Sequence, residues 1–327
     1  KRIQLQLQVE VALVKALADL GKIPQGAAKK IELGAKQVTT ERVNELEKET
    51  NHDVMALVKA LTEKSGDAGR YVHLTATSCD IVDTAISLQL KQATGILLQK
   101  SRKLLKVWLD LARKYEGTVM IGRTHGQHAI PITLGFKFAN YADKLGNDIL
   151  WTEEFYKHCL KGKFSGAVGS YAAQQVIGID GGALEEKICG RLGINPALIS
   201  MQTIPRENYA RLSSALAIMA GTLEQAGKEV RNLQRTEIGE LSEPFGKKQV
   251  GSSTMAQKRN PINCENICSN ARVVRANLMP LLENIALEHE RDLTNSAAER
   301  SVFPTMFVLL DDMLERSIKV FSGLQVF

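Results

Sequence analysis

The stretch LAIMAGTLEQAGKEVRNL, residues 216–233, decides the fold class. Its apolar residues recur at alternating steps of three and four, at Leu216, Met219, Leu223, Ala226, Val230 and Leu233. This spacing places them along one face of an α-helix, as the packing of helix against helix requires. The stretch therefore predicts a long helix with a buried seam.

Three more stretches predict long helices of this kind. The first covers residues 80–114, with Leu97, Leu104, Trp108 and Ala112 facing inward. The second seam consists of Ile267, Ala271, Val274, Leu278, Leu281 and Ile285. The third begins with Phe303, Phe307, Leu310 and Leu314. Four long amphipathic helices indicate an all-α bundle.

Strand signals are confined to residues 118–121 and 174–178. Polar and glycine-rich residues instead gather at 122–131, 161–182 and 243–261, which we predict to be loops. Because binding and catalytic side chains are often held on loops, chemistry is expected there.

Composition narrows the class of protein. The 327 residues exceed the usual size of one core, so we expect two or more domains or one elongated bundle. No apolar run is long enough to cross a membrane, and five scattered cysteines indicate a reducing cytoplasm rather than a disulfide framework. The net charge of +6 is dispersed, which favours a small anionic partner over a nucleic acid.

We predict neither a metal nor a cofactor. His125 and His128 lack a third ligand at suitable spacing, and Cys264 and Cys268 have the spacing of packing residues on a helix. His158 is interpreted as structural. The sequence contains no phosphate-binding loop, dinucleotide motif or serine-hydrolase elbow.

The segment GSSTMAQKRNP, residues 251–261, predicts an anion site. Asn260 is a favoured N-cap and Pro261 suits the first helical position, so a helix should begin here. A helix start offers free backbone N–H groups, and Lys258 and Arg259 add positive charge. The residues alone leave a flexible linker before a capped helix as the alternative.

The same segment, followed by Glu265, resembles the signature loop of the fumarase/aspartase superfamily, whose members usually have proline in place of Ala256. Further motifs match this superfamily in order: NHDV at 51–54, HLTATSCD at 73–80, GRTHGQ at 122–127 and HERD at 289–292. Together they resemble the adenylosuccinate lyases, more than argininosuccinate lyases or fumarases. The resemblance spans about residues 50–320.

The resemblance implies an elongated helical bundle that forms a homotetramer with shared active sites. It implies an N-terminal domain over residues 1–75, incomplete at its start, and a central long-helix domain over residues 76–327, with the family's C-terminal domain absent from the chain. The implied reaction is elimination of fumarate from adenylosuccinate to give AMP, and from succinylaminoimidazole carboxamide ribotide, in purine biosynthesis. The cysteines, the apolar runs and the dispersed charge lead us to expect a cytoplasmic protein without nucleic-acid or membrane partners.

The resemblance also implies roles for individual residues. Ser252 is the base, His125 is the acid that protonates the departing nitrogen, and Glu265 orients the imidazole. Lys258 and Asn260 hold the carboxylate whose charge grows during proton removal. Glycines and serines near position 251 imply a mobile lid.

Further substrate contacts follow from the resemblance. The succinyl part is assigned to Thr77, Ser78 and Gln202, and the nucleotide part to His52, Asp53 and His73. Phosphate and base contacts are assigned to Arg291, Ser296 and Arg300, and Thr124 and Ser253 complete the set. For the arginines, a solvated helix face is the alternative that the residues alone leave open.

Two other classes of function compete with this one. The first is another lyase of the superfamily, such as an argininosuccinate lyase or a carboxymuconate cycloisomerase. The second is a non-catalytic helical scaffold. The presence of Ser252, Lys258, His125 and Glu265 favours an enzyme, because a scaffold needs none of them.

Overall fold

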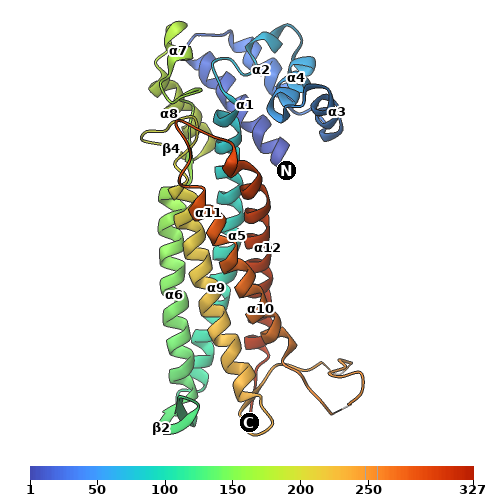
Figure 1. Ribbon diagram of the computed structural model, residues 1–327, viewed down its shortest axis with the longest axis vertical. Helices are drawn as coiled ribbons and strands as arrows, with labels where there is room; N and C mark the ends of the chain where they lie inside the picture. The colour runs from blue at the N-terminus through green and yellow to red at the C-terminus, as the bar shows by residue number, and fades with distance from the viewer. Residues whose placement is uncertain (247, 256) are drawn as a thin grey trace. The chain divides into compact units, whose positions relative to one another are not determined.

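The computed structural model describes residues 1–246, 248–255 and 257–327 (Figure 1). Lys247 and Ala256 lie outside the described residues, and Ala256 is the position at which the resembled superfamily usually has proline. The chain divides into two compact units. Unit 1 comprises Lys1–Gln92, His158–Tyr209 and Asn284–Asn295, and unit 2 comprises Ala93–Lys157, Ala210–Glu283 and Ser296–Phe327. The domain boundary expected between residues 75 and 76 stays a prediction.

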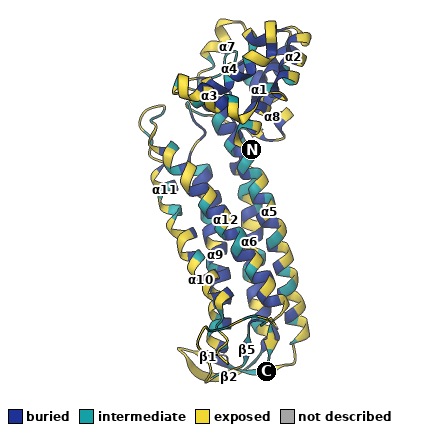
Figure 2. Ribbon diagram, turned by 90° about the vertical axis from the view of Figure 1, so that its right-hand side faces the viewer, coloured by how far each residue is buried: buried dark blue, intermediate teal, exposed yellow. Residues whose placement is uncertain are grey.

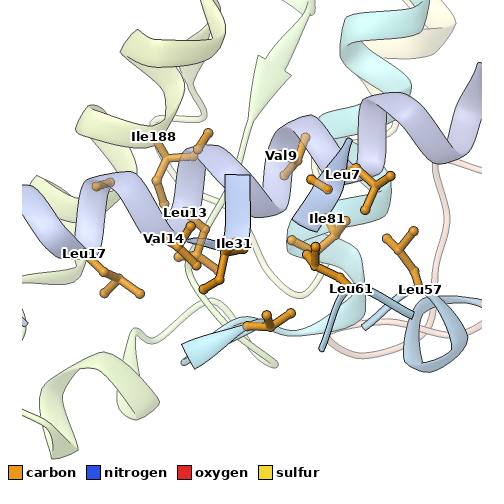
Figure 3. Packing of buried hydrophobic residues seen from close by; sticks show 14 of the residues in the cluster. Leu7, Val9, Leu13, Val14, Leu17, Ile31, Leu57, Leu61, Ile81 and Ile188 are labelled. Carbon is orange, nitrogen blue, oxygen red and sulfur yellow. The ribbon is translucent and has the colours of Figure 1, made fainter. Parts of the chain in front are cut away.

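Unit 1 is built from short helices around an apolar core. Its helices are α1 (Arg2–Asp19), α2 (Gln25–Ala35), α3 (Thr40–Thr50), α4 (Asp53–Ser65), the 3₁₀ helix η1 (Gly66–Tyr71), the start of α5 (Ser78–Lys114), α7 (Ala172–Val176) and α8 (Gly181–Leu192). Helix α1 packs against α2, α4 and α8. Leu13, Leu17, Ile31 and Leu61 are fully buried between these helices (Figure 3), so the core fixes the chain that precedes α5.

Unit 2 is a bundle of long helices. They are the rest of α5, α6 (Leu134–Cys159), α9 (Glu207–Leu233), α10 (Ile262–Ala276) and α12 (Thr294–Ser322), and the short helix α11 (Leu278–Glu283) follows α10. All six seam residues of α9 are buried. In Figure 2, buried residues recur along the long helices of the bundle. Trp108 of α5 packs edge-on against Phe321 of α12. The prediction of a helical fold is confirmed.

The second predicted seam is shorter than expected. Helix α10 ends at Ala276, Leu278 is half-buried, and Ile285 is exposed beyond the end of α11. Pro280 explains the break, because proline has no N–H to donate to the carbonyl four residues earlier. The chain therefore bends where a continuous helix was predicted.

Strands occur in three small pairs. Strand β1 (Val119–Thr124) is antiparallel to β2 (Gln127–Thr133), so the stretch 122–131 is a hairpin rather than the predicted loop. Two shorter pairs join β3 (Lys161–Gly162) to β4 (Asn195–Pro196) and β5 (Leu241–Ser242) to β6 (Gln325–Val326).

The predicted strand at 174–178 is wrong, since most of it lies in α7. Its Gln174 side chain is buried and donates to the Phe164 carbonyl at 2.9 Å, a tertiary contact that the local sequence does not reveal. Along the described residues, no helix has the length and apolarity of a membrane span.

Candidate active site

The signature segment, residues 251–260, is a loop that folds back on itself before α10. A Cβ atom at Gly251 would stand only 2.0 Å from the Lys258 carbonyl oxygen, so a side chain does not fit there. The Asn260 amide donates from Nδ2 to the Gly251 carbonyl at 2.9 Å. The two ends of the segment are therefore held in contact.

Ser252 lies within this loop with two donors aimed at its hydroxyl oxygen. Its Oγ accepts from the backbone N–H of Thr254 at 3.3 Å and of Met255 at 3.1 Å. Donors in this arrangement stabilise negative charge on the oxygen, which a serine needs in order to act as a base.

The start of α10 differs from the sequence prediction. Its N-cap is Pro261 rather than Asn260, and no cap side chain bonds to it. The buried Glu243 carboxylate accepts from the backbone N–H of Asn263 at 3.2 Å and of Cys264 at 2.6 Å. The sequence predicted free N–H groups at this helix start. For Asn263 and Cys264 this prediction is wrong, because the Glu243 carboxylate already accepts from both N–H groups.

A cleft of about 820 Å³ opens beside the loop. Three residues that the sequence assigned to the site, Lys258, Asn260 and Glu265, line it. Five cationic side chains face one carboxylate there: Lys228, Arg231, Arg235, Lys258 and Arg259 against Glu265. Such a cleft attracts anions.

The sequence analysis did not predict that Lys228, Arg231 and Arg235 belong to the site. Lys228, Arg231 and Arg235 are spaced by three and four residues, which places them on one helix face. Within the described residues, no carboxylate pairs with Arg231, Arg235 or Lys258. Their spacing could have indicated a shared site, but a solvent-exposed basic helix end shows the same spacing.

His125 lies at the tip of the β1–β2 hairpin. It and Gly126 both have positive φ, 53° and 73°, as the favoured two-residue hairpin turn requires. Thr124 pairs with Gln127 across this turn, and all four residues are exposed. The imidazole is therefore presented to solvent at the tip of the hairpin.

An ion pair fixes the strand before His125. Arg123 Nη1 donates to Glu240 Oε2 at 3.0 Å, and Nη2 bonds the other carboxylate oxygen. Hydrogen bonding to Arg123 holds the pKa of Glu240 below its ordinary value. Both partners therefore stay charged at neutral pH. No hydrogen bond joins His125 to Glu265 within the described part of a single chain.

In unit 1, Thr77 and Ser78 stand at the start of α5. The Thr77 N–H donates to Asp80 Oδ2 at 2.8 Å. Asp80 pairs with Lys163, and both side chains are fully buried. Lys163 also donates to the Gly166 carbonyl at 3.2 Å. A buried ion pair that the sequence analysis missed thus holds the turn that carries Thr77 and Ser78.

Gln202 and Arg291 meet in unit 1. Arg291 Nη1 donates to Gln202 Oε1 at 2.7 Å, and Gln202 Nε2 donates to the Ala167 carbonyl at 2.7 Å. The sequence assigned these two residues to different parts of the substrate. The structure brings their side chains into direct contact.

The three residues assigned to the nucleotide have partners of their own in unit 1. His52 caps α4 by accepting from the Met55 N–H at 3.3 Å, and Asp53 pairs with Arg2 at 2.8 Å. His73 Nδ1 lies 2.6 Å from Glu10. Burial alone would lower the pKa of His73, but the hydrogen bond to Glu10 and the negative charges of Glu10 and Asp80 together outweigh burial, so the pKa is raised.

The remaining predicted residues lie in unit 2. Ser296 and Arg300 are one turn apart on α12, where Arg300 Nε donates to the Ser296 carbonyl at 3.2 Å. Ser253 is exposed next to Ser252. Among the described residues, no group of three or more His, Cys, Asp and Glu side chains has the arrangement of a metal site.

Comparisons with known proteins decide the family. A family model described as Lyase matches residues 1–276. Adenylosuccinate lyase of Pyrococcus horikoshii is 49% identical over 328 residues, which cover all of this chain and 72% of that protein. The chain belongs to the adenylosuccinate lyase family. It is therefore a lyase, as the resemblance predicted.

Solved structures agree on the fold of this lyase family. A fumarate lyase from Mesorhizobium matches with a TM-score of 0.90 and 30% identity, over all of this chain and 73% of that one. A β-carboxy-cis,cis-muconate cycloisomerase from Acinetobacter calcoaceticus matches with a TM-score of 0.89 and 30% identity, over 100% and 74%. The fold is thus that of the fumarase/aspartase superfamily. The identity to the cycloisomerase is lower than to the adenylosuccinate lyase, so the cycloisomerase alternative is not favoured.

Proposed function

We propose that this lyase eliminates fumarate from adenylosuccinate to leave AMP, and from succinylaminoimidazole carboxamide ribotide in the same way. The observation that carries the proposal is the cationic cleft lined by Lys258 and Asn260 of the signature segment. Both substrates bring carboxylates and a phosphate. Five cations line the cleft, of which Lys228 pairs with Glu224 at 2.8 Å, so positive charge exceeds negative charge there. The family relationship supplies the identity of the substrates.

Proton removal is the step for which the loop is suited. Taking a proton from the carbon beside a carboxylate creates a dianion, which fixed positive charge and hydrogen-bond donors must stabilise. We assign the proton abstraction to Ser252, whose oxygen faces two backbone N–H groups. Lys258 and Asn260 stabilise the carboxylate on which the charge grows.

Cleavage of the carbon–nitrogen bond requires an acid on the other side of the substrate. We assign it to His125, which protonates the departing nitrogen, with Glu265 orienting its imidazole. Because the two side chains share no hydrogen bond within the described part of one chain, their pairing calls for residues of another copy. This argument supports active sites that are shared between copies.

The homotetramer is supported by exposed apolar side chains on the long helices of unit 2. Leu150 and Trp151 of α6, Ile218 of α9 and Val308 of α12 are each more than 60% exposed. Contiguous exposed apolar surface is typical of faces that pack against another protein, and Leu150 and Trp151 are neighbours on α6. We propose that copies of the chain associate through these faces, in the cytoplasm.

Substrate binding is assigned to the residues outside the loop. Thr77, Ser78 and Gln202 contact the succinyl part, and His52, Asp53 and His73 contact the nucleotide. Arg291, Ser296 and Arg300 hold the phosphate and base. Thr124 and Ser253 flank the acid and the base. Two arginines suit a phosphate because the guanidinium group binds its oxygens in pairs.

A substrate panel tests the reaction. The full-length protein is mixed in turn with adenylosuccinate, with argininosuccinate, and with fumarate plus ammonia, and the absorbance change is followed. Turnover of adenylosuccinate alone is expected. Turnover of argininosuccinate instead, or of none of them, would contradict the proposal, and the latter result would favour a scaffold.

Mixed oligomers test the shared site. His125→Ala and Ser252→Ala variants are each expected to be inactive, and to regain activity when the two are unfolded and refolded together. Regained activity arises only if an intact His125 from one copy and an intact Ser252 from another serve one site. Failure to regain any activity, with oligomers of normal size, would argue against sharing.

A further inference from the structure

The signature segment lies within a longer loop, residues 244–259. Two side chains outside this segment hold the two ends of the loop together. The first is Glu243, just before the loop. Its carboxylate accepts from the Asn263 N–H at 3.2 Å, from Asn263 Nδ2 at 2.8 Å and from the Cys264 N–H at 2.6 Å. The residue that enters the loop is thereby bound to the helix that follows it.

The second side chain is Gln234, directly after α9. Its Oε1 accepts from the Glu243 N–H at 2.9 Å, and its Nε2 donates to the Arg259 carbonyl at 3.1 Å. One amide group thus contacts both the residue before the loop and its last residue. The loop is closed at its base by Gln234 and Glu243 together.

The Glu243 side of this base is shielded from water and tied to the bundle, whereas Gln234 is half-buried. Glu243 is 5% exposed and Asn263 7%. Asn263 Oδ1 accepts from Arg316 of α12 at 3.2 Å, and the residues just before Glu243 pair as β5 with β6. Hydrogen bonds to a charged group in such a place are strong and are not readily replaced by water.

We infer that Gln234 and Glu243 are positioning residues for the elimination: they fix where Ser252 and Lys258 stand relative to Glu265. The inference rests on the proposed function. Glu243 is buried outside the cleft lining, and Gln234, which lines the cleft, acts here through its bonds to Glu243 and Arg259. They act by keeping the two ends of the loop together, so that the segment between them returns to one position each time it closes. A displacement of about 1 Å in a reacting group can cost roughly 100-fold in rate.

The test uses the full-length protein with Glu243→Gln and Gln234→Leu. Glutamine at position 243 keeps the size of the side chain but removes its charge. Its amide N–H group would also face the N–H groups of Asn263 or Cys264, which need an acceptor. Leucine at 234 removes both of that residue's bonds. Gln225→Leu is the matched control, because Gln225 is exposed on α9, the helix that Gln234 directly follows, and accepts only from Lys144 among the described residues, at 2.9 Å.

Two quantities are measured in each variant. The kcat for adenylosuccinate is expected to fall roughly 10- to 100-fold while KM changes less than about three-fold. Backbone amide exchange of residues 248–255 is expected to quicken about ten-fold or more, with exchange in α9 and α12 unchanged. The control should match the wild type in both.

Either of two results would overturn the inference: wild-type kcat in both variants, or a reduced kcat with unchanged exchange at residues 248–255. If Glu243→Gln does not fold, Gln234→Leu alone decides by the same criteria. If the wild type itself fails to turn over adenylosuccinate, the proposed function fails instead. The exchange measurement then still reports on the base of the loop.

Discussion

The start of α5 and the start of α10 each bury a carboxylate, and they obtain it from different places in the sequence. At α5 the group is Asp80, three residues after Thr77, and Lys163 neutralises it. At α10 it is Glu243, twenty residues before Asn263, and it accepts from N–H groups of Asn263 and Cys264 rather than from a cation. The first helix start is fixed by an ion pair, whereas the second is fixed by backbone donors at the base of a loop.

The difference suits what each helix start has to do. Thr77 and Ser78 are held by a local contact over a buried ion pair, which favours a rigid binding surface. Ser252 and Lys258 lie on a loop whose base is fixed but whose middle is exposed, which favours movement during binding and release. Four substitutions, from the largest expected effect to the smallest, test this contrast.

Lys163→Met should have the largest effect on stability. It leaves the Asp80 carboxylate buried without its cation, which typically costs about 3–5 kcal/mol in the free energy of unfolding. Urea denaturation measures the loss. Lys161→Met is the control, since Lys161 is two residues away and only partly buried. Equal losses in the two variants would show that the ion pair does not fix this helix start.

Glu243→Ala should cost less, about 1–3 kcal/mol, because it leaves buried N–H groups unbonded without stranding a charge. The same urea titration applies. A loss as large as that of Lys163→Met would remove the contrast between the two helix starts. A loss below about 0.5 kcal/mol would mean that water replaces the carboxylate.

Glu10→Gln should have an effect that depends on pH. Glu10 raises the pKa of His73, so the stabilisation from the charged imidazole is complete below the ordinary histidine pKa, about 6.5, and is lost as pH rises through the raised value. The variant should therefore lose about 1 kcal/mol more at pH 6 than at pH 9. Chemical denaturation at the two pH values measures this. A loss that is the same at both would contradict the charged pair.

Asp180→Ala should have the smallest effect, about 0.5–1 kcal/mol. Asp180 caps α8 by accepting from the Ala183 N–H at 3.1 Å, at an exposed position. It represents a local cap without burial. Thermal unfolding of the two variants measures this. If Asp180→Ala loses as much stability as Glu243→Ala, so that their thermal midpoints coincide, then burial does not strengthen the contribution of a helix cap to stability.

The long helices were predictable because periodicity is a local property of the sequence. The seams of α9 and α12 follow from steps of three and four, and residues 80–114 mark nearly the whole of α5. The break after Ala276 was missed because the apolar pattern continues through it, although Pro280 was a visible warning. The strand expected at 174–178 failed because Gln174 is held by tertiary contacts.

The site was predictable only where its residues are neighbours in the sequence. Lys258, Asn260 and Glu265 lie within eight positions, and one cleft contains them. Glu243 escaped notice because its partners, two backbone N–H groups and the Asn263 side-chain amide, lie about twenty residues away, which no spacing rule connects. Lys163 escaped notice because a lysine in a polar stretch usually lies in solvent, whereas this one is fully buried beside Asp80.

The release of fumarate from adenylosuccinate, measured for the wild type and for Ser252→Ala in the full-length protein, tests the central claim most directly. We predict steady turnover by the wild type and a loss of at least about 100-fold in the variant, with its helical circular dichroism unchanged. Fumarate release by Ser252→Ala at a rate near that of the wild type would contradict the account.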